Sequence, residues 1–332
     1  MLKFKCYHLN NDLWKLIWRS WWGLDYLWFL DKTKNIAEKV EDWNEADIII
    51  RFQSNLNAFG WVLLEKNLQK YYQICELSKT KPIVYMFSDF EIMMKIQDRM
   101  IQRFGREVPI LNKDNVYVVH YYKDTEKLKE YWNSQKWNFK IDNFIYRDLS
   151  LNYFFWDMLE IKDDYIDEVC YVGHDRKWMR NNFLRKFDDI TIVWKRKDRY
   201  VIKWFKYLNW MAGDKLADFL NWYFGQITTY DEIGIKYKCT NYRILLTISA
   251  WCLPIIDAKL KYLDLPREFD ILFVENNEDL LKIRTMWKDD RRLLINNLIR
   301  YYRDYQMNYN YNDLFHLILE KHAKLSQNMN SI

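Results

Sequence analysis

The stretch CYVGHDRKWMRNNFLRKF, residues 170–187, decides how the second half of the chain folds. Its first residues are apolar and include aromatic and β-branched side chains, which predicts a buried strand that ends at Val172. Gly173 permits a tight turn directly after that strand. The residues from Arg176 to Phe187 have the spacing of an amphipathic helix. A strand, a tight turn and a helix in this order make one unit of a parallel α/β sheet.

Three basic side chains, Arg176, Lys177 and Arg180, lie at the start of this predicted helix. The first turn of a helix carries N–H groups without intrahelical partners, and these favour a bound anion. Arginine and lysine add charge-assisted hydrogen bonds, and the arginine fork suits a phosphate. The segment therefore predicts a phosphate-binding turn. The alternative interpretation is an ordinary turn between strand and helix whose basic side chains are solvated.

The same alternation of short apolar runs with longer amphipathic stretches extends along the chain and predicts βαβ units. We expect strands at residues 2–8, 46–52, 82–87, 116–120, 168–172, 190–194, 225–229, 253–256 and 271–274. We expect helices at residues 57–77, 90–104, 125–132, 176–187, 215–223, 241–250 and 277–288. The tail from 293 to 325 is compatible with helix almost throughout, with a weak break at MNYNYND, residues 307–313.

The length of 332 residues fits two domains. Residues 150–167 lack a clean hydrophobic period, so we interpret them as the connection between the domains. We predict domains at 1–160 and 161–292, followed by C-terminal helices at 293–332 that pack back on the first domain. The predicted fold class is therefore α/β, with two Rossmann-like domains facing a cleft. Ligands of parallel α/β sheets bind beyond the carboxyl ends of the strands, so we expect the site residues directly after the strands.

The composition narrows the functional classes. A net charge of +5, from 51 basic and 46 acidic residues, permits an anionic ligand or DNA without demanding either. The chain has only 7 glycines and neither a G-x-G-x-x-G nor a G-x-x-x-x-G-K motif, which argues against dinucleotide-binding and P-loop proteins. Its 5 cysteines are far apart and argue against a zinc site or a disulfide framework. Without a signal-peptide pattern or a long apolar run, we expect a cytoplasmic monomer that does not contact a membrane.

Two further segments extend the pattern: TNYRILLTISAWCLPIID, residues 240–257, and DILFVENNEDLLKIRTMW, residues 270–287. Together with residues 170–187, and in this order, they resemble the nucleotide-sugar-binding half of the GT-B glycosyltransferases. The resemblance covers residues 168–290. The matching positions are Tyr171-Val172-Gly173 with Arg176, then Arg243 and Pro254, and then Val274 with Glu278 and Leu280.

The resemblance implies that residues 161–292 bind a nucleoside-diphosphate sugar, expected to be UDP-linked, and that residues 1–160 bind the acceptor. It also implies a reaction without a metal or any cofactor besides that co-substrate. The implied donor contacts are Gly173, Arg176, Lys177, Arg180, Thr240, Asn241 and Arg243. The chain departs from the family at Leu246, where a glutamate usually holds the donor ribose, and at Trp251, where glycine is normal. We therefore expect an altered donor site.

Glycosyl transfer needs a base that deprotonates the acceptor hydroxyl, and a carboxylate or an imidazole serves this role. The candidates in the first half, in order, are Asp89 in VYMFSDFE, His120 in VYVVH and Asp25 in WWGLDYL. Alternatively, Ser88 or Asp89 caps the predicted helix at Phe90, and His120 is an ordinary histidine at a strand end.

The alternative is the GT-A fold, whose enzymes hold a metal ion through a D-x-D motif. This motif does not occur in the sequence. The nearest variant is Asp89-Phe90-Glu91. The paired α/β halves and the basic turn after Gly173 favour the GT-B interpretation instead.

Residues 194–210, WKRKDRYVIKWFKYLNW, interleave basic and aromatic side chains, and WRSWW at 18–22 has a similar character. Such a mixture suits phosphate contacts together with stacking on unpaired bases. The candidate nucleic-acid contacts are Trp194, Lys195, Arg196, Lys197 and Arg199. Alternatively, the charges are a solvated face and the aromatic side chains belong to the core.

This surface on a glycosyltransferase suggests the phage enzymes that attach sugars to hydroxymethylated pyrimidines after flipping them out of double-stranded DNA. Such an enzyme would work in the host cytoplasm. Two alternatives remain open: a glycosyltransferase acting on a glycan, lipid or protein, and a non-catalytic nucleic-acid-binding protein. Salt-dependent affinity for DNA separates the first interpretation from the second, and binding of a nucleotide sugar separates both from the third.

Overall fold

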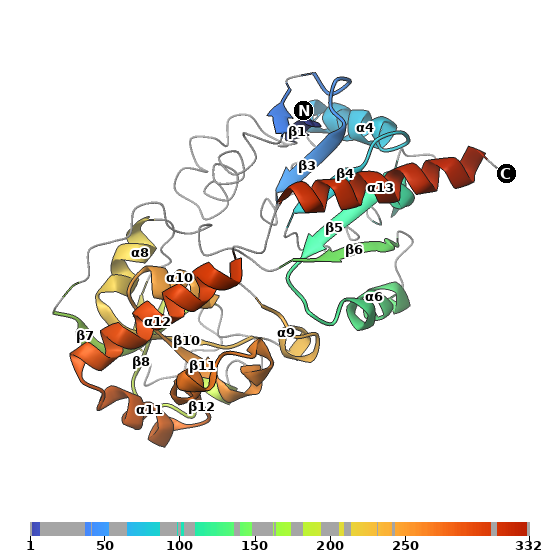
Figure 1. Ribbon diagram of the computed structural model, residues 1–332. Coiled ribbons are helices and arrows are strands. Elements are labelled where there is room, and N and C mark those ends of the chain that lie inside the picture. Colours follow the sequence, from blue (N-terminus) through green and yellow to red (C-terminus); the bar gives the residue numbers. More distant parts are fainter. Residues whose placement is uncertain are drawn as a thin grey trace. The chain divides into compact units, whose positions relative to one another are not determined.

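The computed structural model describes residues 2–6, 37–40, 42–52, 65–86, 98, 101–102, 110–135, 140–147, 162, 164–173, 182–193, 206–208, 214–230, 232–240, 243–306 and 311–330. These residues divide into two compact units, drawn in Figure 1. Unit 1 contains the described residues up to 147 together with 311–330. Unit 2 contains those from 162 to 306.

The strands described in unit 1 form one six-stranded sheet in the order β2-β1-β3-β4-β5-β6, and every pairing is parallel. Their bounds are β1 Leu2–Cys6, β2 Ala37–Lys39, β3 Ile48–Phe52, β4 Ile83–Met86, β5 Val116–His120 and β6 Asn143–Tyr146. All residues of β5 are buried, as expected for a parallel strand covered on both faces. This explains why β5 reads in the sequence as a continuous apolar run.

The described helices of unit 1 bury the apolar residues that recur every three or four positions. They are α4 Glu65–Leu77, the 3₁₀ helix η2 Lys113–Asn115, α6 Thr125–Ser134 and α13 Tyr311–Asn330. In α6 the buried residues are Leu128 and Trp132, and in α13 they include Leu314 and Ile318. An i, i+4 spacing places such a pair on one face of the helix. The C-terminal helix α13, red in Figure 1, therefore belongs to the core of unit 1.

The strands described in unit 2 form a second six-stranded parallel sheet in the order β12-β11-β10-β7-β8-β9. Their bounds are β7 Ile166–Val172, β8 Ile190–Val193, β9 Lys206–Leu208, β10 Tyr223–Thr228, β11 Leu253–Asp257 and β12 Phe273–Val274. The chain adds β8 and β9 on one side of β7, and then returns to add β10, β11 and β12 on the other side. The strand order therefore reverses between β7 and β10, which is where ligands of doubly wound sheets bind.

Helices α8 and α10 cover one face of this sheet through a shared apolar cluster. The helices and 3₁₀ helices described in unit 2 are α8 Asp214–Asn221, α9 Glu232–Lys236, α10 Arg243–Ser249, η4 Ala258–Leu263, η5 Arg267–Leu272, α11 Asn277–Arg284 and α12 Lys288–Gln306. The cluster consists of Cys170, Val172, Val193, Leu216, Leu220, Tyr223, Leu246, Ala250 and Cys252. It joins β7, β8 and β10 to both helices, so the carboxyl edge of β7 is held against the start of α10.

Helix α12 is fixed to unit 2 by the buried Arg291, which is 2% exposed. Its guanidinium donates hydrogen bonds to the carbonyl oxygens of Phe224 at 3.2 Å, Tyr223 at 3.3 Å and Trp251 at 2.9 Å. The guanidinium carbon also lies 4.3 Å from the centre of the Tyr165 ring. Burial lowers the pKa of Arg291, but an arginine keeps its charge, and the carbonyl dipoles and the ring solvate it.

Most expected elements agree with the structure, and the differences have local causes. Strands β2, β6 and β9 were not expected. Strands β2 and β9 are only three residues long, and β6 begins with the polar residue Asn143. The expected strand at 271–274 shortens to β12, because a 3₁₀ helix runs to Leu272. Helix α8 ends at Asn221, since β10 begins two residues later.

The C-terminal tail divides differently from the expected boundary between residues 292 and 293. That boundary falls inside α12, which belongs to unit 2, whereas α13 belongs to unit 1. Of the expected connection at 150–167, residues 150–161 and 163 lie outside the described part of the chain, and Ile166 and Asp167 belong to β7. No helix within the described parts of the chain combines the length and apolarity needed to cross a bilayer.

Replacing Arg291 tests whether it clamps α12. We expect Arg291→Met to lower the free energy of unfolding by about 2 kcal/mol, because the buried Trp251 carbonyl loses its donor. Urea unfolding gives this value. Arg300→Met on the same helix is the matched control, since Arg300 is exposed and its loss should cost little. Equal losses in the two variants would contradict the assignment.

Candidate functional site

The candidate site lies at the carboxyl ends of β7 and β10, where the strand order of unit 2 reverses. Gly173 follows β7 directly, and Thr229 and Tyr230 follow β10. Helix α10 begins here with Arg243.

Arg243 and Gly173 fit together as a matched pair. The Arg243 Nη1 group donates a hydrogen bond to the carbonyl of Val172, and the guanidinium carbon lies 5.4 Å from the centre of the Tyr171 ring. A Cβ atom on Gly173 would lie 2.9 Å from Nη2 and 3.2 Å from Nη1 of Arg243. The guanidinium therefore occupies space that only glycine leaves open. We call this arrangement the arginine cradle.

Gly173 is required for a second reason. Its φ angle is 138°, a value that residues with a side chain rarely adopt. Its N–H donates to the carbonyl of Val193, at 3.3 Å, so the turn remains joined to β8. The backbone conformation strains any side chain at this position, and a Cβ there would also force the Arg243 guanidinium to shift.

Polar side chains on β10 lie under the start of α10. The Thr247 hydroxyl is 2.7 Å from Gln226 Oε1 and 2.7 Å from the carbonyl of Arg243. Gln226 Nε2 and Thr228 Oγ1 are buried and make no hydrogen bond. They are two residues apart in a strand, so they share the face that α10 covers. Since buried polar groups almost always have partners, these two atoms retain hydrogen-bonding capacity near the cradle.

A buried carboxylate, Asp257, ends β11 on the neighbouring side of β10 and is 3% exposed. It accepts hydrogen bonds from the Thr229 hydroxyl at 2.8 Å and from the Lys259 amide at 3.1 Å. Burial raises the pKa of this carboxyl, and the two hydrogen bonds work in the opposite direction. Asp257 caps η4 and ties the ends of β10 and β11 together. Asp257 was not predicted as a site residue, although a polar residue directly after the buried run LPII is a usable signal.

His120 ends β5 in unit 1, and its side chain is fully buried. Its Nδ1 accepts a hydrogen bond from the Tyr122 amide at 3.1 Å, so the neutral ring carries its proton on Nε2. The ring packs edge-on against Phe144, with centroids 5.9 Å apart, and near Tyr146. Burial lowers the pKa of His120 to about 4. The imidazole is therefore neutral at neutral pH.

The structure brings together Gly173 and Arg243 among the predicted donor contacts, and it places the half-buried Thr240 three residues before α10. The remaining predicted site residues lie outside the described part of the chain: Asp25, Asp89, Arg176, Lys177, Arg180, Trp194, Lys195, Arg196, Lys197, Arg199 and Asn241. The parts played by Tyr171, Gln226 and Thr228 could not be predicted from the sequence, because these residues approach Arg243 and α10 only in the folded sheet.

The structure accounts for the two departures from the family pattern, Leu246 and Trp251. The Leu246 side chain belongs to the apolar cluster under α10, together with Cys170 and Leu216. Trp251 has a φ angle of 54°, in the left-handed region where glycine is normally favoured, just after α10 ends. The Cys252 N–H donates to the carbonyl of Thr247, which closes the helix end. The tryptophan thus keeps the backbone turn that a glycine would make, and buries its ring.

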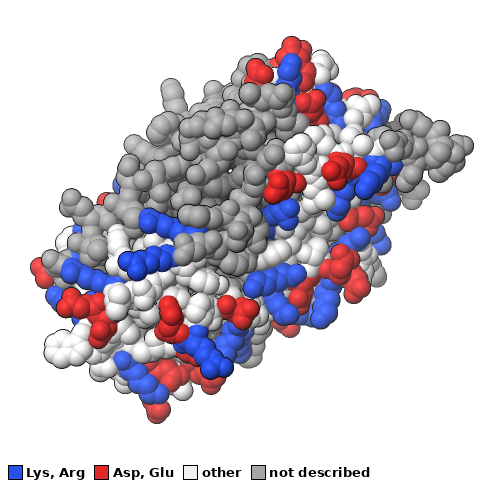
Figure 2. All heavy atoms as spheres, in the orientation of Figure 1, with Lys and Arg blue, Asp and Glu red and all other residues white. Residues whose placement is uncertain are grey.

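The charges visible in Figure 2 are mixed in sign over the described part of that face, with lysine and arginine beside aspartate and glutamate. No group of three His, Cys, Asp or Glu side chains among the described residues is arranged to hold a metal ion.

The comparisons with known proteins bear on the fold. No protein-family model matches the sequence, and no curated protein sequence matches it. Solved structures do. β-Glucosyltransferase of T4 phage, in complex with UDP and Mn²⁺, matches with a TM-score of 0.63 over 96% of this chain and 99% of that chain, at 13% identity.

Two other solved structures also match this chain over nearly its full length. A DNA-modifying β-glucosyltransferase, determined with and without uridine diphosphoglucose, matches with a TM-score of 0.56 over 98% of this chain and 99% of that chain, at 14% identity. An α-glucosyltransferase bound to UDP-glucose and to DNA containing an abasic site matches with a TM-score of 0.56, over 96% and 98% of the two chains, at 9% identity. The chain has the GT-B fold. The predicted fold class, with two parallel α/β domains, is confirmed.

The buried state of His120 predicts a loss of stability in acid. Its pKa is about 4 in the folded chain, below the value of about 6.5 for an exposed histidine, so between these pH values only the unfolded chain binds the proton. Stability therefore falls as the pH drops. We expect a loss of about 2 kcal/mol from about pH 7 to about pH 5.

Urea unfolding of the wild type and of His120→Asn at both pH values isolates this contribution. The asparagine Oδ1 can still accept from the Tyr122 amide, but the side chain does not titrate. The variant should therefore lose less stability in acid than the wild type. The same pH dependence in both proteins would show that His120 is not the group responsible.

Proposed function

We propose that this chain is a glycosyltransferase that moves glucose from UDP-glucose to a hydroxymethylated pyrimidine in double-stranded DNA. The observation that carries the proposal is the arginine cradle, which holds a guanidinium at the point of strand reversal in a sheet of the GT-B fold. The similar structures contain UDP, UDP-glucose and DNA, in a β-glucosyltransferase of T4 phage and an α-glucosyltransferase. Their match spans nearly the full length of both chains.

The cradle supports binding of a diphosphate. Arg243 is held from one side by the Val172 carbonyl and the Tyr171 ring, so its orientation is fixed before a ligand arrives. A guanidinium keeps its charge at any physiological pH and forms paired hydrogen bonds to phosphate oxygens. Gly173 leaves the space that this guanidinium occupies. In this proposal Arg176, Lys177 and Arg180 add further positive charge from the segment after Gly173.

The transfer step follows from these roles. The acceptor hydroxyl gives its proton to a carboxylate as its oxygen forms a bond to the anomeric carbon of the glucose. The bond between that carbon and the diphosphate oxygen breaks, and UDP leaves with the electron pair. Arg243 stabilises the negative charge that develops on the leaving diphosphate. Since the His120 side chain is fully buried, it is not open to an acceptor hydroxyl, and we propose the carboxylate of Asp89 as the base.

One of the similar structures contains Mn²⁺ together with UDP. The described residues of this chain contain no set of three side chains that fits such an ion. In this proposal Arg243 stabilises the charge on the leaving diphosphate, whichever ion accompanies the nucleotide.

The acceptor assignment is tested with duplex DNA of one sequence that contains either 5-hydroxymethylcytosine or cytosine. We expect mass spectrometry to show one added glucose on each accessible hydroxymethylated base when UDP-glucose is supplied. The cytosine duplex should remain unmodified, because it lacks the acceptor hydroxyl. Binding of UDP-glucose without transfer to either duplex would favour a glycan, lipid or protein acceptor instead.

The role of Arg243 is tested by calorimetric titration with UDP. We expect Arg243→Ala to weaken binding by about 100-fold and Arg243→Lys by an intermediate amount, because lysine keeps the charge but loses the fork. Arg267→Ala is the matched control, since Arg267 is an exposed arginine of the same unit. Unchanged affinity in Arg243→Ala would rule out the proposed contact with the diphosphate.

A further inference from the structure

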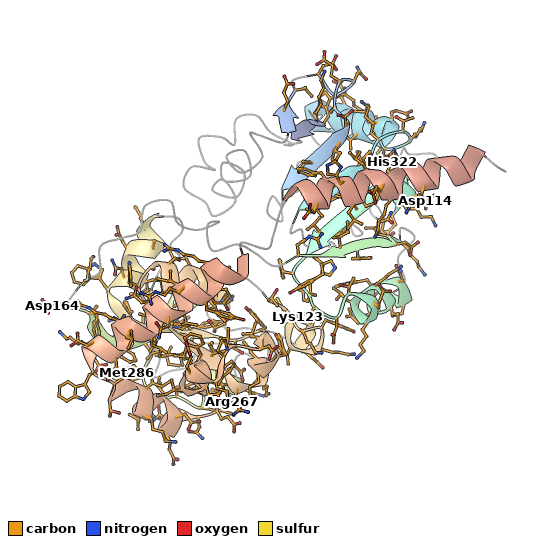
Figure 3. All side chains as sticks on the ribbon, viewed as in Figure 1. Asp114, Lys123, Asp164, Arg267, Met286 and His322 are labelled. Atoms are coloured by element: carbon orange, nitrogen blue, oxygen red, sulfur yellow. The ribbon has the colours of Figure 1, made fainter. Side chains whose placement is uncertain are left out.

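The C-terminal helix α13 is attached to unit 1 through His322, whose ring lies between two oxygen atoms. Its Nδ1 is 3.0 Å from Asn115 Oδ1, and its Nε2 is 3.1 Å from the carbonyl oxygen of Thr80. Figure 3 shows His322 on α13 beside the segment that carries Asp114, the residue before Asn115. The two oxygens belong to segments far from α13 in the sequence, so this contact is a tertiary one. We call it the histidine clasp.

The orientation of the Asn115 amide is fixed by its other hydrogen bonds. Its Nδ2 group donates to the carbonyl of Ser78 at 2.8 Å and to that of Lys79 at 3.3 Å. Rotating the amide by half a turn would place Oδ1 against these two carbonyl oxygens. Asn115 is fully buried, so water cannot relieve such a clash. The oxygen of the amide therefore points at His322 and must accept.

The surroundings of Asn115 keep it in place. The Ser78 hydroxyl donates to the Cys75 carbonyl at 2.6 Å and accepts from the Asn112 amide at 2.8 Å. The Asn143 side chain donates to the carbonyl of Asp114 at 2.8 Å. This network joins the end of α4, the 3₁₀ helix η2 and the start of β6. The acceptor that faces His322 thus sits on a rigid part of unit 1.

Both ring nitrogens of His322 face atoms that can only accept. A neutral imidazole has one donor and one acceptor, whereas an imidazolium has two donors. The clasp is complete only in the imidazolium form, because any neutral form sets a nitrogen lone pair against an oxygen lone pair. We propose that His322 is a proton-dependent clasp that holds the C-terminal helix on unit 1 and weakens as the pH rises.

The charged groups near the clasp do not replace this mechanism. Those on the elements that carry its acceptors and on α13 itself are Glu76, Lys79, Lys81, Lys113, Asp114, Glu320, Lys321 and Lys324. Glu76 and Lys79 form an exposed ion pair at 2.6 Å, and the Lys81 ammonium donates to backbone carbonyls of residues 43, 44 and 46. The Nδ1 and Nε2 atoms each lie within hydrogen-bond distance of an uncharged oxygen.

The histidine clasp lies on the helix with which the chain returns from unit 2 to unit 1. Helix α12 belongs to unit 2, and α13 is the next described element and belongs to unit 1. Helix α13 also buries Leu314, Phe315 and Ile318, so the clasp adds to an apolar attachment rather than making it alone. We therefore expect a rise in pH to increase local opening of α13 while unit 1 stays folded.

The test uses the full chain labelled with ¹⁵N in its histidines. In the wild type at about pH 6 both ring nitrogens of His322 should show the shifts of protonated nitrogens, with the signal assigned by its loss in His322→Gln. Amide hydrogen exchange of α13, corrected for the intrinsic effect of pH, should become about tenfold faster relative to α6 between about pH 6 and about pH 8. His316→Gln is the matched control, because His316 is an exposed histidine of the same helix.

Two variants make the outcome decisive. His322→Gln should exchange quickly at both pH values, and His322→Arg should exchange slowly at both, since arginine supplies several N–H donors and keeps its charge. A single protonated ring nitrogen in the wild type at the lower pH would overturn the proposal. So would exchange in α13 whose corrected rate does not depend on pH, or an equal pH dependence in the wild type and in His322→Arg.

Discussion

The contact between Arg243 and Gly173 is the constraint on which the candidate site depends. The guanidinium occupies the space where any side chain at position 173 would lie, since a Cβ there would come within 2.9 Å of it. The two residues are far apart in the sequence and meet because α10 packs over β7 and β10 at the reversal of strand order. A fixed positive charge therefore stands where parallel α/β sheets bind their ligands. This geometry is the basis of the proposed diphosphate contact.

The rest of unit 2 holds this contact in place. The apolar cluster from Cys170 to Cys252 fixes the height of α10 over the sheet, and the Thr247 hydroxyl joins α10 to Gln226 of β10. Arg291 connects α12 to the backbone of β10 and to the Trp251 carbonyl just beyond α10. Two arginines of unit 2 thus have different roles. Arg291 is surrounded by carbonyl groups and secures packing, whereas Arg243 is half-buried at an edge and can meet a ligand.

The buried strands were predictable from the sequence because each is a run of apolar residues, and the whole of β5 was placed correctly. Short edge strands such as β2 and β9 carry too few residues for a periodic signal. The glycine turn at 173 was also predictable, but the partner that fills its space was suggested only by the family resemblance. Contacts over long sequence distances, such as His322 with Asn115, leave no trace in a single sequence. The unused polar atoms of Gln226 and Thr228 likewise become visible only when the strands are assembled.

A double-mutant cycle of Gly173→Ala and Arg243→Ala, read by calorimetric binding of UDP, tests the central claim most directly. If Gly173 matters because it makes room for the guanidinium, Gly173→Ala should weaken UDP binding by about tenfold or more in the wild type but by less than about twofold in the Arg243→Ala background. The free energy of unfolding of each variant shows how much of the change comes from the strained φ angle at 173. Losses of affinity that simply add would contradict the account, because the two residues would then act on the ligand independently.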